Sequence, residues 1–204
     1  MFTQGLIDSR TYSLYLNDIG TADGSILFGG LDLDKFTGPL HTLPLNAGPS
    51  GTVSRFYITL TNMTIASGSS TISVSGTYPI NALLDSGTTA LVFPSGIYHS
   101  FLNIFGATGM DPTTGFPRLS QCPPRGSLNF HFSGAEIQVP FQEFVVESNG
   151  ACNLLVESSD SPCAILGDAF LRSAYVVYDL VRITPWQYAD TNRIIRKSRW
   201  GRQN

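Results

Sequence analysis

The chain has 204 residues, with 12 Lys and Arg against 15 Asp and Glu, and only 13% of its positions are charged. Soluble domains usually carry about 25% charged residues, so hydroxyl side chains from 22 Ser and 18 Thr cover more of this surface. With 20 Gly, 12 Pro and 42% apolar residues, this composition excludes a helical bundle, a coiled coil and a disordered chain. The length fits one domain, and no apolar run approaches the ~18 residues needed to span a bilayer.

Strand patterns dominate the chain from its amino terminus onward. Short segments alternate between apolar and polar residues, or are rich in β-branched residues, and Gly, Pro, Ser or Asn bound them. Such segments are typical of strands, and a continuous apolar run fits a strand buried on both faces. We therefore predict an all-β, mostly antiparallel fold with strands at 12–16, 25–28, 56–60, 71–74, 128–132, 136–139 and 174–178.

One or two short helices are the exceptions. Pro94 suits a first helical turn, apolar side chains follow it at spacings of three or four, and Gly106 can end the helix. Residues 168–172 predict one further helical turn. The Gly-, Pro- and Thr-rich residues 106–124 predict a long surface loop.

Basic residues are concentrated at the carboxyl end. The last dozen residues contain five of them, and residues 1–192 hold 7 basic against 15 acidic residues, a net charge of −8. An acidic body repels nucleic acid, so we expect no nucleic-acid partner. We expect residues 181–204 to form a poorly ordered basic tail.

The cysteines give no sign of a metal site. Cys122, Cys152 and Cys163 form no C-x-x-C motif, and no Cys or His spacing fits zinc. The residues themselves leave open one disulfide with a free thiol, as in an exported protein, or three reduced thiols. Asn62 begins a glycosylation sequon, which matters only in a secretory pathway. The first thirty residues contain no signal-peptide pattern.

Asp85 is the strongest candidate for a catalytic residue. It follows the apolar run 82–84 and precedes Ser86, Gly87 and Thr88, after which a second apolar run begins. Gly87 permits a tight turn, and the hydroxyls of Ser86 and Thr88 can hydrogen-bond the carboxylate. The same residues also fit an ordinary turn that begins with Asp.

A second segment, 164–180, reads Ala-Ile-Leu-Gly-Asp-Ala-Phe-Leu-Arg-Ser-Ala-Tyr-Val-Val-Tyr-Asp-Leu. With segments 4–17 and 24–32 and the residues around Asp85, it resembles the carboxy-terminal lobe of pepsin-like aspartic proteases of the fungal yapsin and candidapepsin type. The resemblance covers residues 4–180 and implies the carboxy-terminal lobe of a bilobal, all-β acid protease fold. We therefore expect residues 1–180 to form that lobe.

The resemblance implies a role for each matching residue. Asp85 is expected to be the second catalytic aspartate of an aspartic-type endopeptidase, supported by its neighbours in the loop and by an apolar-apolar-Gly element that threads beside it. The lobe's usual disulfide is expected, with Cys163 as an extra thiol. The expected supporting residues are Ser86, Gly87, Thr88, Ile165, Leu166, Gly167 and Asp168, and the expected disulfide joins Cys122 and Cys152.

Peptide hydrolysis of this kind needs two aspartates, one to activate water and one to protonate the scissile carbonyl. The chain contains one Asp-Ser-Gly motif, at Asp85. We therefore expect the family's amino-terminal lobe, which carries the other aspartate, to be the partner, and a peptide or protein to be the substrate, with no metal or cofactor. The chain alone is expected to be inactive, although two copies of Asp85 in a self-associated pair would offer another route to activity.

After Leu180 the sequence departs from the family, which normally adds a further strand there. Pro185 is poorly placed for a central strand, so we expect that strand to be missing. One hypothesis is that residues from Val181 onward are translated from a retained intron. The resemblance also implies a secreted, cell-surface or vacuolar protein.

Other hydrolase classes lack their motifs in this sequence. There is no G-x-S-x-G for a serine hydrolase and no H-E-x-x-H for a metalloprotease. His41 and His99 lie in no recognisable context, and His131 fits an outward-facing position in a strand. The remaining alternative is a non-catalytic β domain or pseudo-enzyme, whose signature would be loss of Asp85 or its hydroxyl neighbours; these are intact.

Overall fold

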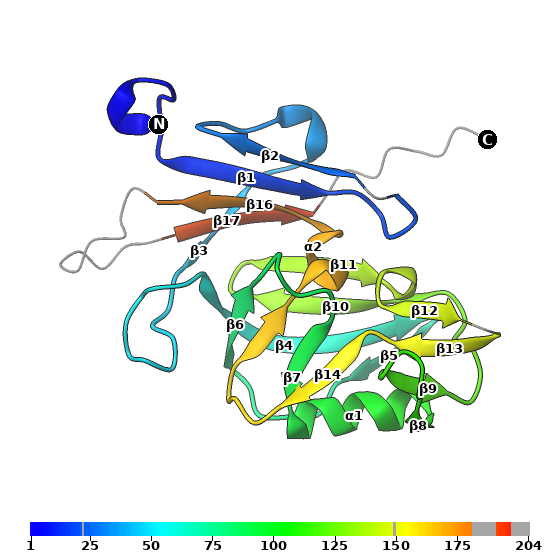
Figure 1. The fold of residues 1–204 in the computed structure, drawn as a ribbon. Helices are drawn as coiled ribbons and strands as arrows, with labels where there is room; N and C mark the ends of the chain where they lie inside the picture. The colour runs from blue at the N-terminus through cyan, green and yellow to red at the C-terminus, as the bar shows by residue number, and fades with distance from the viewer. Residues whose placement is uncertain (22, 149, 181–190, 197–204) are drawn as a thin grey trace.

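The computed structural model describes the chain except residues 22, 149, 181–190 and 197–204, and it describes the strand at 191–196 by its backbone alone. Three sheets and two α-helices make up the described part (Figure 1), and no helix in it could span a membrane. The five-stranded sheet has the order β2 (Gly24–Phe28), β1 (Thr11–Leu16), β16 (Ala174–Asp179), β17 (Thr191–Arg196) and β3 (His41–Pro44).

The eight-stranded sheet contains most of the buried strands, and a four-stranded sheet lies beside it. The eight-stranded sheet follows the order β11 (Ala135–Pro140), β10 (Gly126–Phe132), β4 (Tyr57–Ser67), β6 (Ile80–Leu84), β15 (Ala164–Leu166), β7 (Leu91–Pro94) and β14 (Val156–Ser159), with β5 (Ser70–Ser73) on β4. The small sheet follows the order β12 (Val145–Ser148), β13 (Ala151–Leu154), β9 (Pro117–Leu119) and β8 (Ala107–Met110).

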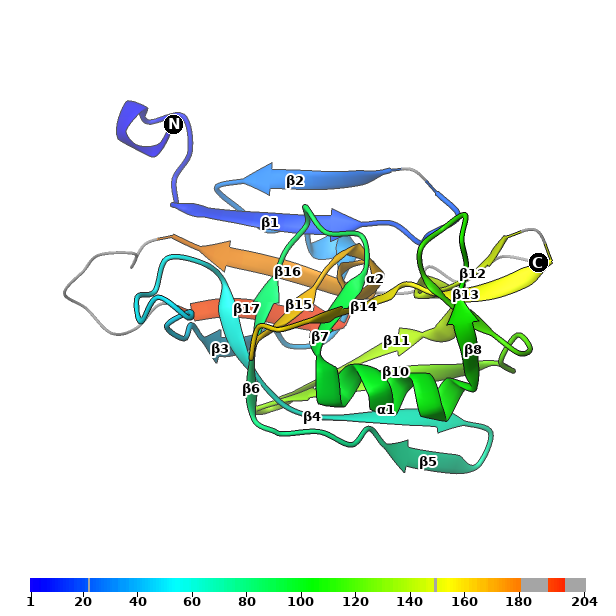
Figure 2. The ribbon, with the colours of Figure 1, turned by 60° about the horizontal axis from the view of Figure 1, so that its bottom comes forward.

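Short helices complete the fold. The helix α1 (Ser95–Phe105) buries Ile97, Tyr98 and Phe101, the face expected from their spacing. The helix α2 (Asp168–Leu171) lies between the five-stranded and eight-stranded sheets in both views (Figures 1 and 2). Three 3-10 turns are η1 (Phe2–Gln4), η2 (Leu33–Lys35) and η3 (Phe141–Glu143).

One hydrophobic core joins the two larger sheets. Leu14 and Val176 of the five-stranded sheet belong to the same buried cluster as Ile58 and Phe130 of the eight-stranded sheet. Phe170 of α2 packs edge-on against Phe130, with ring centroids 4.9 Å apart. Burying a Phe side chain stabilises a fold by about 1.5–3 kcal/mol. The contact of Phe170 with Phe130 therefore helps to hold α2 between the sheets.

The structure confirms the predicted all-β class, the two helices and the seven strands. Six of the strands lie within two residues of their predicted bounds, whereas the strand predicted at 56–60 continues to Ser67. The strand β16 is buried along 174–178, as its apolar run indicated. The disulfide between Cys122 and Cys152 is present, and Cys163 is a buried free thiol.

Two expectations about irregular segments are wrong. Residues 106–124 are not one long loop, because β8 and β9 pair with each other and Arg118 of β9 pairs with Asn153 of β13. The strand expected to be missing after Leu180 exists as β17, which pairs with β16 on one side and β3 on the other. The partner β3 lies about 150 residues earlier in the sequence, and the charged composition of β17 gave no sign of a strand. The rest of the expected tail, 181–190 and 197–204, lies outside the described residues.

Two parallel pairings, β6 with β15 and β7 with β14, interrupt the antiparallel pattern, and the first of them positions the site. The strand β15 lies between β6 and β7, parallel to the first and antiparallel to the second. The loop 85–90, which connects β6 to β7, must therefore pass over the end of β15. Leu166, the last residue of β15, pairs with Leu84 on one side and Leu91 on the other.

Gly167 occupies the crossing point of these segments. Its backbone has φ −82°, which any residue can adopt, so glycine is needed for space and not for conformation. A Cβ atom here would overlap the carbonyl oxygen of Thr88 and would lie 2.5 Å from that of Ala90. Only a residue without a side chain lets the loop lie this close to β15.

We expect Gly167→Ala to lower the free energy of unfolding by about 1–3 kcal/mol or more, because its Cβ meets backbone atoms that cannot yield cheaply. Gly96→Ala is the matched control, since Gly96 lies in α1 with open space around it and Ala should stabilise that helix by up to about 1 kcal/mol. Urea unfolding of both variants measures the difference. Equal effects of the two substitutions would contradict the close crossing.

Candidate active site

Asp85 is the first residue after β6 and stands directly beside the apolar-apolar-Gly element. Its backbone N–H donates to the carbonyl oxygen of Leu166 at 3.2 Å, which continues the parallel pairing of β6 with β15 by one residue. The side chain is half-buried, whereas Ser86 and Gly87 are exposed. The carboxylate therefore lies at the surface end of a buried strand.

Both oxygens of the Asp85 carboxylate accept hydrogen bonds within the loop. The Gly87 N–H donates to Oδ1 at 3.1 Å, and the Thr88 hydroxyl donates to Oδ2 at 2.9 Å. The Thr88 N–H also donates to the Asp85 carbonyl at 3.3 Å, which closes the turn. These bonds fix the orientation of the carboxylate before any ligand arrives.

The structure brings together most, but not all, of the contacts expected from the sequence. The expected Thr88 hydrogen bond is present. In the described residues the second donor to the carboxylate is the Gly87 amide and not the Ser86 hydroxyl. A glycine in the motif indicated a tight turn, but which N–H would reach the carboxylate follows only from the backbone geometry.

The helix α2 holds the other side of the loop. The Asp168 N–H donates to the Thr88 carbonyl at 2.7 Å, and the Ala169 N–H donates to the Thr89 carbonyl at 3.1 Å. The first amides of a helix have no partner within it, and here the loop 85–90 supplies their acceptors. The loop is thus hydrogen-bonded to β15 at one end and to α2 at the other.

Asp168 contributes a second carboxyl group near Asp85. Burial raises the pKa of Asp168 most, the Arg172 guanidinium lowers it, and the Asp85 carboxylate raises it by repulsion. The pKa of the Asp168 carboxyl is therefore above its ordinary value of 3.8. The two acidic groups on this side of the chain influence each other electrostatically.

An aromatic cluster borders the site, and the sequence analysis did not identify it. The rings of Tyr12 and Tyr178 stack with centroids 4.6 Å apart, and Phe56 packs edge-on against Tyr178 at 4.5 Å. Burial raises the pKa of Tyr178, and the charges of Tyr12 and Asp85 raise it further. The alternating pattern of β1 and β16 contained both tyrosines, but only the register Tyr12↔Tyr178 places them opposite each other.

Other candidate groups lie away from Asp85. No cluster of three His, Cys, Asp or Glu able to hold a metal occurs among the described residues. His131 lies on the outer face of β10 as expected, with Nδ1 3.3 Å from the Glu136 carboxylate and Nε2 3.0 Å from the Thr64 hydroxyl. Asn62 is half-exposed on β4, opposite His131 in register.

A cavity of about 690 Å³ lies at the end of β6 opposite Asp85. Its lining includes Ile80 and Asn81 at the start of β6, Pro94 at the end of β7, Gly96 in α1, and Cys163 just before β15. The candidate catalytic group, Asp85, therefore does not line this cavity.

The raised pKa of Asp168 gives a test based on pH. The folded chain protonates Asp168 at a higher pH than the unfolded chain, so its contribution to stability is lost as pH rises from 3.8 through the raised pKa. The free energy of unfolding of Asp168→Asn, relative to the parent chain, should therefore rise across this window. Denaturant titrations at closely spaced pH values measure it.

Asp111→Asn is the matched control for this experiment, because backbone N–H groups of Thr114 and then Thr113 lower the pKa of Asp111. Its carboxylate stabilises the fold above 3.8, and that contribution is lost as pH falls through the lowered pKa. The relative stability of Asp111→Asn should therefore fall as pH rises toward 3.8. If the relative free energies of unfolding of both variants changed in the same direction with pH, the opposite pKa shifts of Asp168 and Asp111 would be contradicted.

Comparison with known proteins finds aspartic proteases among the relatives of this chain. The family model for eukaryotic aspartyl proteases matches residues 1–184. The chain is 43% identical to an acid protease of Saccharomycopsis fibuligera over 87% of its length, which is 46% of that protein. It is 38% identical to a probable aspartic-type endopeptidase of Aspergillus oryzae over 88% of its length, which is 39% of that protein.

A third relative is the secreted aspartic protease 8 of Candida albicans, with 38% identity over 87% of the chain and 40% of that protein. The chain thus spans less than half the length of these three relatives. An aspartate at the start of a tight loop, crossed by an apolar-apolar-Gly strand, lies inside the matched region. The chain belongs to the eukaryotic aspartyl protease family.

Proposed function

We propose that the chain is the carboxy-terminal lobe of an aspartic endopeptidase and that Asp85 is one of its two catalytic aspartates. The observation that carries the proposal is the state of the Asp85 carboxylate, which accepts hydrogen bonds from Gly87 and Thr88 at the edge of a loop fixed by β15 and α2. The alternative, a non-catalytic β domain, does not explain why the loop holds the Asp85 carboxylate in a fixed orientation.

The chemistry follows from placing a second carboxyl group opposite Asp85. Two carboxyl groups within hydrogen-bond distance do not both ionise readily, so they share one proton. The ionised group removes a proton from water as it attacks the peptide carbonyl, while the protonated group donates to the carbonyl oxygen. In this scheme Thr88 and the Gly87 amide orient Asp85, Asp168 is a supporting acid, and no metal or cofactor takes part.

The second aspartate comes from an amino-terminal lobe. The match to this chain spans only 39–46% of the length of the relatives. Nine of the eleven large apolar side chains exposed on the described residues lie in the first 33 positions, including Ile26, Leu27 and Phe28 of β2. The strand β2 is also an outer strand of its sheet. Apolar surface of this kind marks an interface.

The exposed Ser86 side chain is free to contact the partner lobe's loop, as its place in the motif implies. A pair formed by two copies of this chain is less well supported, because a two-fold pair needs a self-complementary surface and this surface is proposed to fit a different lobe. The disulfide and the relative named as secreted support an exported protein, with Asn62 as its glycosylation site.

The proposal predicts that the chain alone has no peptidase activity and gains it when paired with an amino-terminal lobe. The amino-terminal half of the Saccharomycopsis fibuligera acid protease, refolded with this chain, provides the test. Pepstatin-sensitive cleavage of a peptide should appear at about pH 3–5, where one of two paired carboxyl groups is ionised. Asp85→Asn should reduce its rate by roughly 10²–10⁴-fold or more, because it removes a group that transfers a proton.

Asp111→Asn is the control, since Asp111 caps a distant turn, and it should leave the rate of the pair nearly unchanged. Cleavage by the chain alone would contradict the half-site proposal. Cleavage by the pair that survives Asp85→Asn would contradict the role of Asp85.

A further inference from the structure

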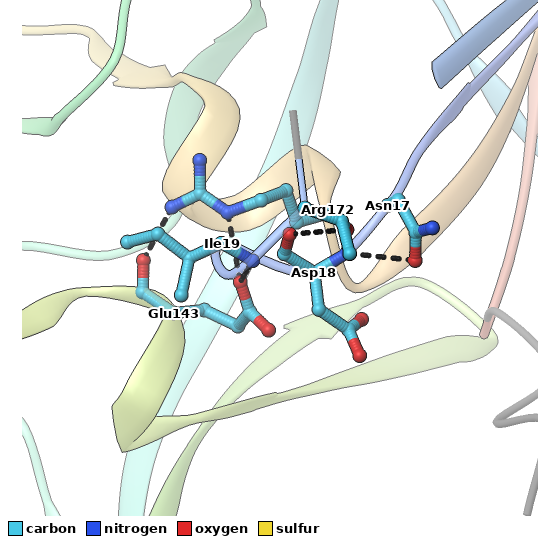
Figure 3. A network of polar contacts seen from close by, with 6 residues as sticks. Asn17, Asp18, Ile19, Glu143 and Arg172 are labelled. Atoms are coloured by element: carbon cyan, nitrogen blue, oxygen red, sulfur yellow. Dashed lines mark hydrogen bonds and ion pairs between the residues drawn. The ribbon is translucent and has the colours of Figure 1, made fainter. Parts of the chain in front are cut away.

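A buried ion pair joins Glu143 and Arg172, 29 residues apart in sequence (Figure 3). Glu143 is 6% exposed and Arg172 is 9% exposed. The Arg172 Nε–H donates to the Glu143 carboxylate at 2.7 Å, and an Nη–H donates to the Glu143 carbonyl oxygen at 2.6 Å. The guanidinium fork thus binds a side-chain and a backbone acceptor of the same residue.

The pair also reaches the five-stranded sheet. The Ile19 N–H, in the connection between β1 and β2, donates to the same Glu143 carboxylate oxygen at 3.2 Å. That connection is folded by its own hydrogen bonds, from the Asp18 N–H to the Asn17 side chain and from Thr21 to the Asp18 carbonyl (Figure 3). Glu143 itself ends η3, which follows β11 of the eight-stranded sheet.

The helix α2 connects this pair to the Asp85 loop. Arg172 directly follows α2, and its N–H donates to the Asp168 carbonyl at 2.9 Å. At the other end, the Asp168 and Ala169 amides bind the carbonyls of Thr88 and Thr89. Four residues of helix span only about 6 Å, so a shift of Arg172 is passed directly to the loop.

We propose that Glu143 and Arg172 are positioning residues for Asp85, which fix α2 and through it the loop 85–90. The inference rests on the proposed catalytic role of Asp85. A buried ion pair adds little net stability over an apolar pair of similar volume. Its directional bonds, however, admit one arrangement of η3, the β1–β2 connection and α2.

The fork geometry is essential to this role. Arg presents two parallel N–H donors to acceptors on one residue, whereas the Lys ammonium is a single point charge on a flexible stem. Arg172→Lys therefore keeps the charge but cannot make both hydrogen bonds to Glu143 in this geometry. Glu143→Gln loses the charge but keeps an oxygen acceptor on the side chain and the backbone carbonyl.

Amide hydrogen exchange of the 204-residue chain tests the proposal, because it reports local opening separately from global unfolding. The quantity of interest is the protection of the Asp168 and Ala169 amides divided by that of the β4–β10 ladder. Arg172→Met should lower this ratio by about tenfold or more, and Arg172→Lys should lower it in the same direction. Val139→Ala, in the buried strand β11, is the destabilised control and should leave it within about twofold.

If Arg172→Met does not fold, Arg172→Lys and Glu143→Gln carry the test, and the lysine variant should show the larger fall in the ratio. A ratio unchanged in Arg172→Lys and Arg172→Met, with all amides losing protection together, would overturn the inference, since the pair would then act on global stability alone.

In the refolded two-lobe pair, Arg172→Lys should lower kcat with KM unchanged, because the loop and not the substrate-binding surface is displaced. A fall in the exchange ratio without any peptidase activity in the unmodified pair would overturn the proposed function while leaving the link from Arg172 to the loop. Activity with an unchanged ratio and unchanged kcat would overturn the positioning role and keep the proposed function.

Discussion

The close approach of Gly167 to the loop 85–90 is the constraint on which the rest of the site depends. The carbonyl oxygens of Thr88 and Ala90 occupy the space that a side chain at 167 would need. Because backbone atoms of three segments meet there, main-chain hydrogen bonds set the position of the loop that carries Asp85. Main-chain bonds hold their geometry without loss of rotamer entropy, and the proposed role of Asp85 requires such a fixed orientation.

The two larger sheets and α2 give this crossing a rigid setting. Phe170 anchors the apolar side of α2 against Phe130 in the core, while Arg172 anchors the polar end to Glu143. The apolar contact supplies most of the free energy, and the ion pair supplies direction. The described chain is thus well ordered around Asp85 while a large apolar surface near its first 33 residues stays uncovered.

Local patterns in the sequence identified those parts of the fold that depend on near neighbours. Period-two alternation identified β1, β10 and β11, and the spacing after Pro94 identified α1. A resemblance carried by 164–180 and the residues around Asp85 identified the disulfide and the loop. The strands β8 and β9 were missed because their own composition is weakly apolar, and β17 was missed because it is rich in charge and one of its partners, β3, is remote. The short strands β3, β12, β13 and β14 were not predicted either.

The same reasoning explains which site features escaped prediction. The Gly87 amide reaches the carboxylate only because the turn closes on Thr88, and the Glu143–Arg172 pair spans 29 residues between elements of different sheets. Arg172 lies in the segment 164–180 that carries the family resemblance, but Glu143 stands in no recognisable motif. Contacts of this kind follow from the assembled sheets and not from the spacing of residues along the chain.

The most direct test of the account is to measure scalar couplings across hydrogen bonds by NMR in the isotopically labelled chain. The account predicts detectable coupling from the Asp168 amide to the Thr88 carbonyl, and from the Asp85 amide to the Leu166 carbonyl, comparable to couplings in the β1–β16 ladder. Ladder couplings without either of these two would show that the loop does not lie across β15, and would contradict the central claim.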